Sequence, residues 1–497
     1  MNTRSCAAQC APAVFIVLCL FLLPLKATAQ CNCDHTFQPE TTIINSTEQG
    51  IEAGDTICIA AGEYEFLRFQ EIHGTEEAPI VIQNCGGQVI IHNEDRAYGL
   101  VMEGASTFFH LTGTGDDAFE YGFDISAPDT DPWPGVALVL GDKSSNYEVD
   151  HLEVHHTGFA GVTCKTDPQC DGSADQDVFI QQNVSLHHLF VHNTGGEGFY
   201  IGSTQSNGHT ITCDGTQEVH QPHFLDGIFV HHNIIERTGW DGAQIGMARS
   251  NCAFYANTIQ NVGSGGVEYQ QQGLQIGAYS SCEVYNNIIM DGPVMGIIVL
   301  GAGNSRFYNN LIVNFGEDGI YANQQDFAAG SAWEFYYNTI IGYTRNGLRV
   351  HGADLDGVVA QNNIIAGAEG QLAIGNEVPN VTESNNLTPS STDGLFIRDS
   401  DFHLIETSPA RGAGTPITDI DFDLDGQLRA APPAVGAYEF TEDSPGKADD
   451  IEPPAPVSPS DNYNVADENG CGCRQILSTS FQSILQLIFT KVCPFQE

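Results

Sequence analysis

The chain has few basic residues. Of 497 residues, 17 are Lys or Arg and 63 are Asp or Glu, which gives a formal net charge of −46 at pH 7. Nucleic-acid binding needs a basic footprint, so this composition argues against nucleic acid as a partner. It also argues against unaided capture of a polyanionic polysaccharide. Bound calcium, neutral glycans, a salty habitat or a simply solvated acidic surface all fit better.

Beyond the first 29 residues, the sequence lacks an apolar run long enough to span a bilayer. Those first residues carry Arg4, an apolar run over 13–25 and the small residues Ala27-Thr28-Ala29. This pattern is typical of a secretory signal with its cleavage site. We therefore expect a secreted or cell-surface protein, extracellular or periplasmic, without a membrane span after signal removal.

Zinc-binding cysteine patterns are also missing. Twelve of the 15 cysteines follow the signal, and neither Cys31/Cys33 nor Cys471/Cys473 has the paired histidines or second CxxC of a zinc site. In an oxidising compartment these cysteines favour disulfides. Cys164 and Cys170 could close a short loop, but the sequence leaves the pairing open.

What the sequence does contain is a repeated seventeen-residue phrase between residues 149 and 351. It reads VDHLEVHHTGFAGVTCK at 149–165, and six further copies start at 186, 230, 254, 284, 307 and 335. The thirteenth position is glycine in every copy: Gly161, Gly198, Gly242, Gly266, Gly296, Gly319 and Gly347. Self-similarity at this period predicts a solenoid.

Period-two alternation around the glycine predicts strands rather than helices. Positions fourteen and sixteen are mostly apolar and should face the interior, whereas position fifteen should face outward. The glycine suits a corner with positive φ or a close backbone approach. Position four is asparagine from the third copy onward, which predicts a column of amides bonded to one another along the axis. Position two gives a tyrosine column: Tyr255, Tyr285, Tyr308 and Tyr336.

This pattern resembles the right-handed parallel β-helix of the pectate-lyase-like superfamily, over roughly residues 40–440. The stretches AGDTICIAAGEYEFLRF (53–69) and GTEEAPIVIQNCGGQVII (74–91) are similar to the opening of chondroitinase B and alginate lyase. In that family a Lys and an Arg abstract the proton while calcium neutralises the uronate. No compact match to those catalytic residues occurs here, so none is carried over.

The chain is therefore expected to comprise a signal peptide (1–29), an all-β parallel β-helix domain (30–440), an acidic Pro/Ser linker (441–470) and a Cys-containing apolar tail (471–497). Residues 113–146 are expected to be a polar loop leaving the first coils. Residues 395–440 are similar to the closing cap of secreted bacterial β-helix proteins. Within them, Asp421, Asp423 and Asp425 copy the start of an EF-hand loop, although the twelfth position is Pro432. This segment is a weak candidate calcium site.

Two insertions mark the expected functional face. Residues 166–180 and 203–223 both leave directly after position seventeen, so they should emerge from neighbouring coils at the same edge. Insertions of this kind in solenoids map to one face, often the binding face.

Histidines concentrate in the three coils beside these insertions. The register stacks His151 with His188 and His232, His187 with His231, and His155 with His192. Histidine is a common metal ligand and a general acid or base. Stacked polar side chains are also ordinary β-helix structure, and that reading is the stronger one for any given pair.

Acidic residues precede the glycine in neighbouring copies, at Glu197 and Asp241. Coils stack about 4.8 Å apart, so these carboxylates should lie close to the spacing of a retaining glycosidase pair. A shared site would raise one pKa and supply an acid with a nucleophile or base. Asp before Gly is also normal turn chemistry, which is the preferred reading for Asp318.

Lys165 lies at the mouth of the first insertion and is a candidate lyase base, although an ion pair with Asp167 or Asp171 explains it better. Arg237 and Arg249 are candidates to hold a substrate carboxylate. The remaining candidate substrate-binding residues are outward or aromatic: Tyr200, Trp240, Gln244, Glu268 and Tyr269.

Two functions are therefore open. The first is a secreted, monomeric polysaccharide lyase or glycoside hydrolase, with possible calcium dependence, acting in a cleft between insertions 166–180 and 203–223. The second is a non-catalytic surface protein that binds glycan through the same face.

Overall fold

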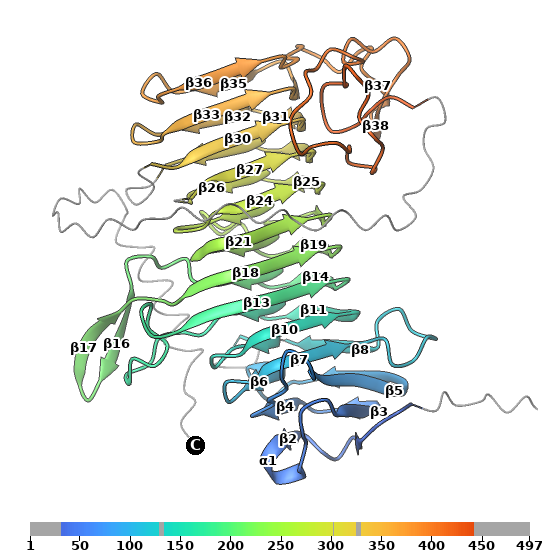
Figure 1. Cartoon of the computed structure of the whole chain (residues 1–497), viewed down its shortest axis with the longest axis vertical. Helices are drawn as coiled ribbons and strands as arrows, with labels where there is room; N and C mark the ends of the chain where they lie inside the picture. The colour runs from blue at the N-terminus through green and yellow to red at the C-terminus, as the bar shows by residue number, and fades with distance from the viewer. Residues whose placement is uncertain (1–30, 129–133, 302, 325–329, 442–497) are drawn as a thin grey trace, which may run out of the picture.

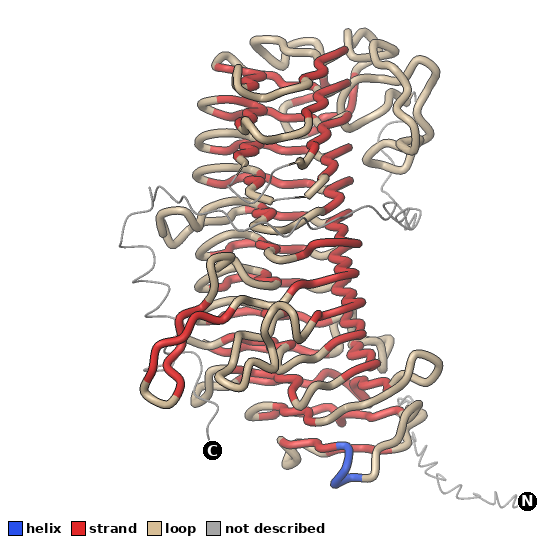
Figure 2. Tube along the Cα trace, turned by 60° about the vertical axis from the view of Figure 1, so that its left-hand side comes forward, coloured by secondary structure: helices blue, strands red, loops and turns tan. Residues whose placement is uncertain are grey.

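The computed structural model describes residues 31–128, 134–301, 303–324 and 330–441. The expected signal (1–29), the tail (471–497) and the linker apart from Thr441 lie outside the described residues. Successive coils of short strands stack along one long axis, so that each turn of the chain lies on the one before it (Figures 1 and 2).

Within the described residues, the strands form a 12-stranded sheet and a 22-stranded sheet, and neighbouring strands in both are parallel. The 12-stranded sheet contains β2 (Ile43–Asn45), β4 (Leu67–Gln70), β6 (Tyr98–Glu103), β9 (Val136–Leu140), β12 (Val162–Cys164), β15 (Phe199–Ile201), β20 (Ala243–Ile245), β23 (Leu274–Ile276), β26 (Ile297–Val299), β29 (Ile320–Asn323), β32 (Asn346–His351) and β35 (Gly370–Ile374).

The 22-stranded sheet consists of two ladders joined through β5. The first contains β1 (His35–Phe37), β3 (Thr56–Tyr64), β5 (Ile80–His92), β7 (Thr107–Thr112), β10 (Ser145–Asp150), β13 (Ile180–His187), β18 (Phe224–His231), β21 (Ala248–Tyr255), β24 (Cys282–Tyr285), β27 (Ser305–Tyr308), β30 (Ala332–Tyr336), β33 (Gly357–Gln361) and β36 (Val381–Ser384). The second contains β8 (Phe123–Ala127), β11 (Leu152–Thr157), β14 (Phe190–Thr194), β19 (Ile234–Thr238), β22 (Thr258–Gln260), β25 (Ile288–Gly292), β28 (Leu311–Phe315), β31 (Thr339–Tyr343) and β34 (Ile364–Ala366).

Outside these sheets the described residues add helix α1 (Ser46–Gln49), the hairpin β16 (His209–Cys213) and β17 (Thr216–His220), and the pair β37 (Phe396–Arg398) and β38 (Asp401–Leu404). The expectation of a loop over residues 113–146 is wrong, because β8, β9 and the start of β10 lie there. The stretch is polar between these strands, and that polarity hid the short apolar runs.

Alternating burial explains the strands. In β5, every second side chain from Ile80 to Gln83 is buried, and the apolar ones join a single core that runs the length of the solenoid. The recurring glycines are explained by the close approach of neighbouring coils, one of the two reasons that the sequence suggested. A Cβ on Gly198 would lie 2.6 Å from Ile235 Cγ2 and 2.5 Å from the carbonyl oxygen of Gly242, distances that no side chain tolerates.

The phrase keeps its register except in the fourth copy. There the strand that pairs with β20 is β23, and its leading glycine is Gly273 rather than Gly266. Residues 264–270 form a loop before that strand. The ungapped phrase put Gly266 in phase by coincidence, because the loop itself contains Gly265-Gly266.

Polar columns lock the coils together as expected. Each asparagine of the column at position four donates its side-chain N–H to the side-chain oxygen of the next one, and the column continues one coil beyond the repeat: Asn233, Asn257, Asn287, Asn310, Asn338, Asn363 and finally Asn386. The rings of Tyr255, Tyr285 and Tyr308 stack in parallel with centroids 4.8 and 4.7 Å apart. Both columns confirm the register derived from the repeat.

The segment 395–440 packs along the flank of the last coils. Ala437 and Tyr438 share an apolar cluster with Leu311 and Val313 of β28, and Ala437 N–H donates to Thr339 Oγ1 at 2.8 Å. At the other end, disulfides Cys31–Cys85 and Cys33–Cys58 tie the first coils. Cys252–Cys282 bridges β21 and β24.

Candidate functional site

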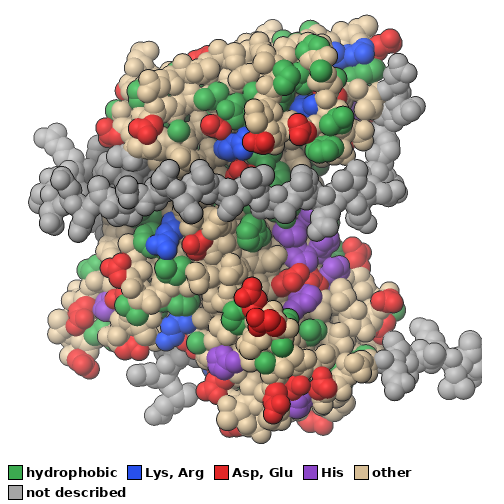
Figure 3. All heavy atoms as spheres, viewed as in Figure 1, with side chains coloured by type: hydrophobic (Ala, Val, Ile, Leu, Met, Phe, Trp, Pro, Cys, Tyr) green, Lys and Arg blue, Asp and Glu red, His purple; other side chains and the backbone are tan. Residues whose placement is uncertain are grey.

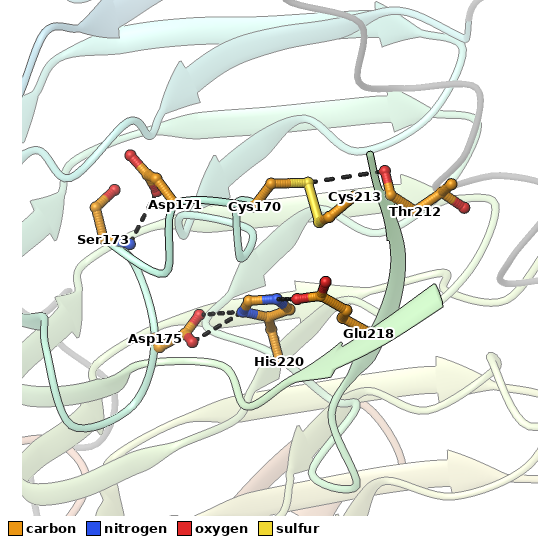
Figure 4. The surroundings of a disulfide bond; sticks show 8 residues. All are labelled: Cys170, Asp171, Ser173, Asp175, Thr212, Cys213, Glu218 and His220. Atoms are coloured by element: carbon orange, nitrogen blue, oxygen red, sulfur yellow. Dashed lines mark hydrogen bonds and ion pairs between the residues drawn. A yellow bond between two sulfur atoms is a disulfide. The ribbon is translucent and has the colours of Figure 1, made fainter. Parts of the chain in front are cut away.

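The two insertions lie together as one flap, which we define as residues 166–180 and 203–223. The disulfide Cys170–Cys213 joins them, with 2.04 Å between its sulfurs. His220 Nδ1 lies 2.8 Å from Asp175 Oδ2 and so adds a second link between the insertions (Figure 4). This geometry confirms the expected common edge and rules out a Cys164–Cys170 bridge, because Cys164 is a free, buried thiol. The cleft expected between the insertions remains a prediction.

Two buried carboxyl groups lie on neighbouring coils, each just before a strand of the 12-stranded sheet. Glu197 and Asp241 each stand two residues before a strand of the 12-stranded sheet, and Gly198 N–H donates to Asp241 O at 3.1 Å. Their relative exposures are 1% and 0%. Gln244 donates a hydrogen bond to Glu197 Oε1, and Gln272 N–H donates to Asp241 Oδ1 at 2.8 Å. The other oxygens, Glu197 Oε2 and Asp241 Oδ2, have no hydrogen-bond partner among the described residues.

Burial makes both carboxyl groups weak acids. Loss of hydration raises the pKa of Glu197 to about 8, opposed by a backbone hydrogen bond and by the charge of Lys165. Desolvation also holds the pKa of Asp241 well above its usual range, and the nearby Glu197 charge raises it further. Two neighbouring carboxyls out of water cannot both ionise easily. The pair therefore retains a proton at neutral pH, which is the state a general acid requires.

Lys165 forms an ion pair with Asp167, which is the interpretation that the sequence favours over a catalytic base. Its Nζ lies 2.5 Å from Asp167 Oδ1 and 4.8 Å from the centroid of the Tyr200 ring. The buried His209 and His223 share this field, since the Lys165 charge helps to lower the pKa of both imidazoles, after desolvation. His223 has a defined tautomer: its Nε2 accepts from Thr166 N–H at 3.0 Å, and its Nδ1 donates to Phe224 O at 3.0 Å.

The outward column of the 12-stranded sheet differs from the expected one after its third member. Gln275, not Glu268, pairs with Gln244, and Gln275 donates to the Gln244 side chain at 3.2 Å. Glu268 and Tyr269 lie on the loop 264–270, and Tyr269 is 59% exposed. They are therefore not part of the column that contains Tyr200 and Gln244.

The aromatic candidates Tyr200 and Trp240 both pack against Phe159. Phe159 contacts Trp240 edge-on, with ring centroids 5.4 Å apart, and contacts Tyr200 at 6.3 Å. Tyr200 is 1% exposed. Packing is thus the observed role of these rings, and a sugar-stacking role stays a prediction.

The arginine candidates belong to the other sheet. Arg237 lies in β19, where its Nε donates to Asn193 Oδ1 at 2.8 Å and its guanidinium pairs with Glu236. Arg249 lies in β21 with its guanidinium 5.2 Å from the Phe224 ring centroid. The structure therefore does not group Arg237 with the outward column of the 12-stranded sheet.

Asp318, at the same repeat position as Asp241, has a structural environment. Its Oδ2 lies 2.6 Å from nitrogens of both Arg345 and Arg349, and its Oδ1 accepts from Asn346. This arrangement confirms the preference for a structural role and separates Asp318 from the two carboxyls that lack such cations.

The histidine columns follow the expected register. Ring centroids are 5.0 Å apart for His151 and His188, 5.2 Å for His188 and His232, and 4.7 Å for His187 and His231. Burial and neighbouring imidazoles lower the pKa of His188 to about 4 and that of His231 to about 3. These two rings are neutral at pH 7. The third expected pair, His155 and His192, stacks at 5.2 Å.

The acidic motif in 395–440 serves a local turn. Asp423 is 1% exposed, and its carboxylate accepts backbone N–H groups of Asp425, Gln427 and Glu439. Asp425 Oδ2 lies 2.7 Å from His403 Nε2, while Asp421 is exposed. Calcium binding by Asp421, Asp423 and Asp425 stays a prediction, and the observed contacts explain why these residues occur together.

A sequence-family profile described as "Right handed beta helix region" matches residues 226–388. The parallel ladders agree with it throughout the described residues. The chain is a right-handed parallel β-helix. This confirms the fold class expected from the repeat.

Several solved structures are similar to this β-helix. Pectate lyase Pel9A has 13% identity and a TM-score of 0.48, covering 83% of this chain and 98% of that one. An alginate lyase from Paenibacillus sp. str. FPU-7 has 18% identity and a TM-score of 0.40, covering 65% and 99%. A GH136 lacto-N-biosidase from Eubacterium ramulus has 12% identity and a TM-score of 0.40, covering 68% and 62%. Such distant likenesses carry no information on the reaction of this β-helix.

A comparison with curated proteins gives no match. Among the described residues, no helix has the length and apolarity needed to cross a membrane.

Sequence reasoning missed a second group of residues on the β-helix. His110, Glu148 and Asp150 converge on the 22-stranded sheet. The sequence pattern that could have revealed this group is the alternation of polar residues in His110-x-Thr112 and Glu148-x-Asp150. It could not be used because treating 113–146 as a loop left no register between these two segments.

Proposed function

We propose that this β-helix is a secreted polysaccharide-active enzyme, and that it hydrolyses glycosidic bonds with Glu197 and Asp241. The observation that carries the proposal is the pair itself: two fully buried carboxyls on adjacent coils, each with one oxygen that has no hydrogen-bond partner among the described residues. A buried carboxyl is costly unless it is paired or hydrogen-bonded. Groups kept in this state are candidates for acid–base chemistry.

The surroundings divide the two roles. Glu197 receives a hydrogen bond from Gln244 and lies in the field of Lys165, so it is the first of the two to lose its proton as the pH rises toward 8, and its ionised form acts as nucleophile or base. Asp241 has a backbone N–H as its partner and the Glu197 charge beside it, so it keeps the proton and acts as the acid. Glycoside hydrolysis uses such a pair, one carboxylic acid and one carboxylate.

Substrate access requires a rearrangement at this edge of the β-helix. Both carboxyls are buried, so a glycan chain reaches them only if side chains at this edge move aside. The Cys170–Cys213 and Asp175–His220 links make the two insertions move together. The disulfides of the described residues fit an oxidising compartment outside the cytosol.

The test is a screen of the mature chain from Gln30 against neutral and uronate polysaccharides, with calcium and with chelator. Reducing ends and the absorbance of unsaturated products are read together. Glu197→Gln and Asp241→Asn should each abolish release of reducing ends. Asp318→Asn is the matched control, because it removes a buried carboxylate from the same repeat position. Undiminished hydrolysis by the Glu197→Gln/Asp241→Asn double variant would refute the roles proposed here.

A lyase is the second candidate, for which Lys165, between Asp167 and the Tyr200 ring, would supply the base as a neutral amine after losing its proton. A β-elimination needs a base that removes the proton next to the carboxylate of a uronate. Unsaturated products that disappear in Lys165→Ala would establish this reaction. Glycan binding without either product would instead favour a non-catalytic surface protein.

A further inference from the structure

Four side chains from three successive coils meet on the outer face of the 22-stranded sheet. They are His110 of β7, Glu148 and Asp150 of β10, and His187 of β13. Register pairs His110 with Glu148 and Asp150 with His187. The intervening Val149 belongs to the core, so the polar residues on either side of it point outward. Histidine and acidic side chains gather on the face drawn in Figure 3.

The distances bring three of these groups together and place His187 beside two of them. One ligand atom each from His110, Glu148 and Asp150 lies within 4.8 Å of the others. His187 Nε2 lies 2.8 Å from Glu148 Oε1 and 3.8 Å from Asp150 Oδ2. His110 Nε2 makes a short hydrogen bond with the same Asp150 oxygen. A metal ion with tetrahedral bonds of about 2.0–2.2 Å holds neighbouring ligand atoms roughly 3.4 Å apart, which is within the range of these separations.

Neighbouring side chains orient the group. Asp150 is 3% exposed, and its Oδ1 accepts from Thr112 Oγ1 at 2.5 Å and from His151 Nδ1 at 2.6 Å. These bonds turn its Oδ2 toward the two Nε2 atoms. His187 Nδ1 lies 2.7 Å from His188 Nδ1, which fixes the ring that presents Nε2. Metal ligands in proteins are held by outer hydrogen bonds of this kind.

We propose that His110, Glu148, Asp150 and His187 bind one divalent transition-metal ion, for which Zn²⁺ is the best match. Two imidazole nitrogens and two carboxylate oxygens form a donor set suited to zinc. Calcium prefers oxygen donors alone, so this site is distinct from any calcium site. Without an ion, each Nε2 must donate a proton to a carboxylate, and the ion replaces those protons. The 47% exposed Glu148 side chain gives ions a path from solvent.

The other clusters of this kind do not offer thiolate ligands. Cys31, Cys33 and Cys85 could converge on an ion, but all three are in disulfides. The same holds for Cys213 beside Glu218 and His220. The cluster on β7, β10 and β13 is therefore the one of these three clusters that does not depend on a disulfide-bonded cysteine. Its ion would join three coils and does not depend on the hydrolase proposed above.

The experiment uses tag-free mature chain, stripped with chelator and dialysed. Zn²⁺ binding is measured by titration calorimetry and by metal content after gel filtration, with Ca²⁺ as competitor and the absorption of bound Co²⁺ as a probe of coordination. We expect one equivalent of zinc, no displacement by calcium, and a Tm that rises with zinc, because the ion binds only the folded chain.

His187→Gln and Glu148→Gln should weaken zinc binding by about 100-fold or more. The matched control is His155→Gln, since His155 Nε2 makes a single carboxylate contact, at 2.7 Å to Asp124 Oδ1. It should keep wild-type affinity. The exposed Glu148 position tests the site even if His187→Gln fails to fold. Wild-type affinity in Glu148→Gln, displacement of zinc by calcium, or absence of zinc binding would overturn the proposal.

Discussion

Replacement of Glu197 by Gln should stabilise the β-helix at neutral and alkaline pH. Gln keeps the shape of the side chain and an oxygen that accepts from Gln244, but it has no proton to lose. In the wild type, the pKa of Glu197 is raised to about 8 in the folded state, from the model-compound value of 4.5. The folded chain therefore binds more protons than the unfolded chain between these two pH values.

The sign follows from this difference in bound protons. The contribution of Glu197 to stability is complete below about pH 4.5 and is lost as pH rises through about 8. At pH 7, the gap of 2.5 pH units from 4.5 corresponds to roughly 3 kcal/mol, at 1.36 kcal/mol per unit. Glu197→Gln removes this loss. We expect its free energy of unfolding to equal that of the wild type near pH 4.5 and to exceed it by about 3 kcal/mol at pH 7.

Urea unfolding followed by circular dichroism at pH 4.5, 6, 7 and 8 measures the difference. Asp318→Asn is the control of opposite sign, because it removes the carboxylate that pairs with Arg349 and one of the two that pair with Arg345, and it should destabilise by about 3 kcal/mol. A Glu197→Gln variant that is less stable than the wild type at pH 7, or a difference that does not grow with pH, would refute the buried, proton-retaining state of Glu197. Gain of stability with loss of activity would mark a residue kept for chemistry.

Three further perturbations probe the framework. Asn287→Ala removes a buried amide that bonds Phe254 O and both neighbouring asparagines, so urea unfolding should show a loss of about 3 kcal/mol or more. At the half-buried end of the column, Asn386→Ala should lose only about 1 kcal/mol. Equal losses would contradict a stabilising role for the buried asparagine column. Cys170→Ser/Cys213→Ser opens a loop with a sequence separation of 43, so the flap should become protease-sensitive, with up to about 4 kcal/mol lost; unchanged cleavage would argue against the tether. His403 hydrogen-bonds two aspartates, which raises its pKa to about 9, so thermal melts should show stability lost from about pH 6.5 to 9, and a flat profile equal to that of His403→Gln would exclude this ion pair.

The repeat carried most of the fold. Glycine, asparagine and tyrosine recur because each coil meets the next at the same point, so the columns through Gly198, Asn287 and Tyr285 could be placed from the sequence alone. The register failed at Gly266, where a loop happened to supply a glycine in phase. It also failed over 113–146, where polar loops separate short strands. A periodic pattern cannot distinguish an inserted loop from a missing coil.

The candidate site was predicted only in part. The placement of Glu197 beside Asp241 followed from the register, and so did the meeting of the two insertions. The partners that decide their chemistry did not follow. Whether a carboxyl meets cations, as Asp318 does, or an amide, as Glu197 does, depends on side chains from other coils and on the loops that cover them. The choice of Cys213 as the partner of Cys170 likewise depends on the path of a hairpin.

The ends of this β-helix determine how it can come apart. Each coil contacts only its neighbours, so the stack behaves as a one-dimensional lattice, and such a lattice normally frays from its terminal layers inward. Here two disulfides crosslink the first layers, and the segment 395–440 packs against the side of the last coils, where Ala437 hydrogen-bonds to Thr339. Because both terminal layers are held, unfolding has to begin in the middle of the stack. The middle coils carry Glu197 and Asp241. Under pulling force or in denaturant, this chain should rupture abruptly rather than unravel coil by coil.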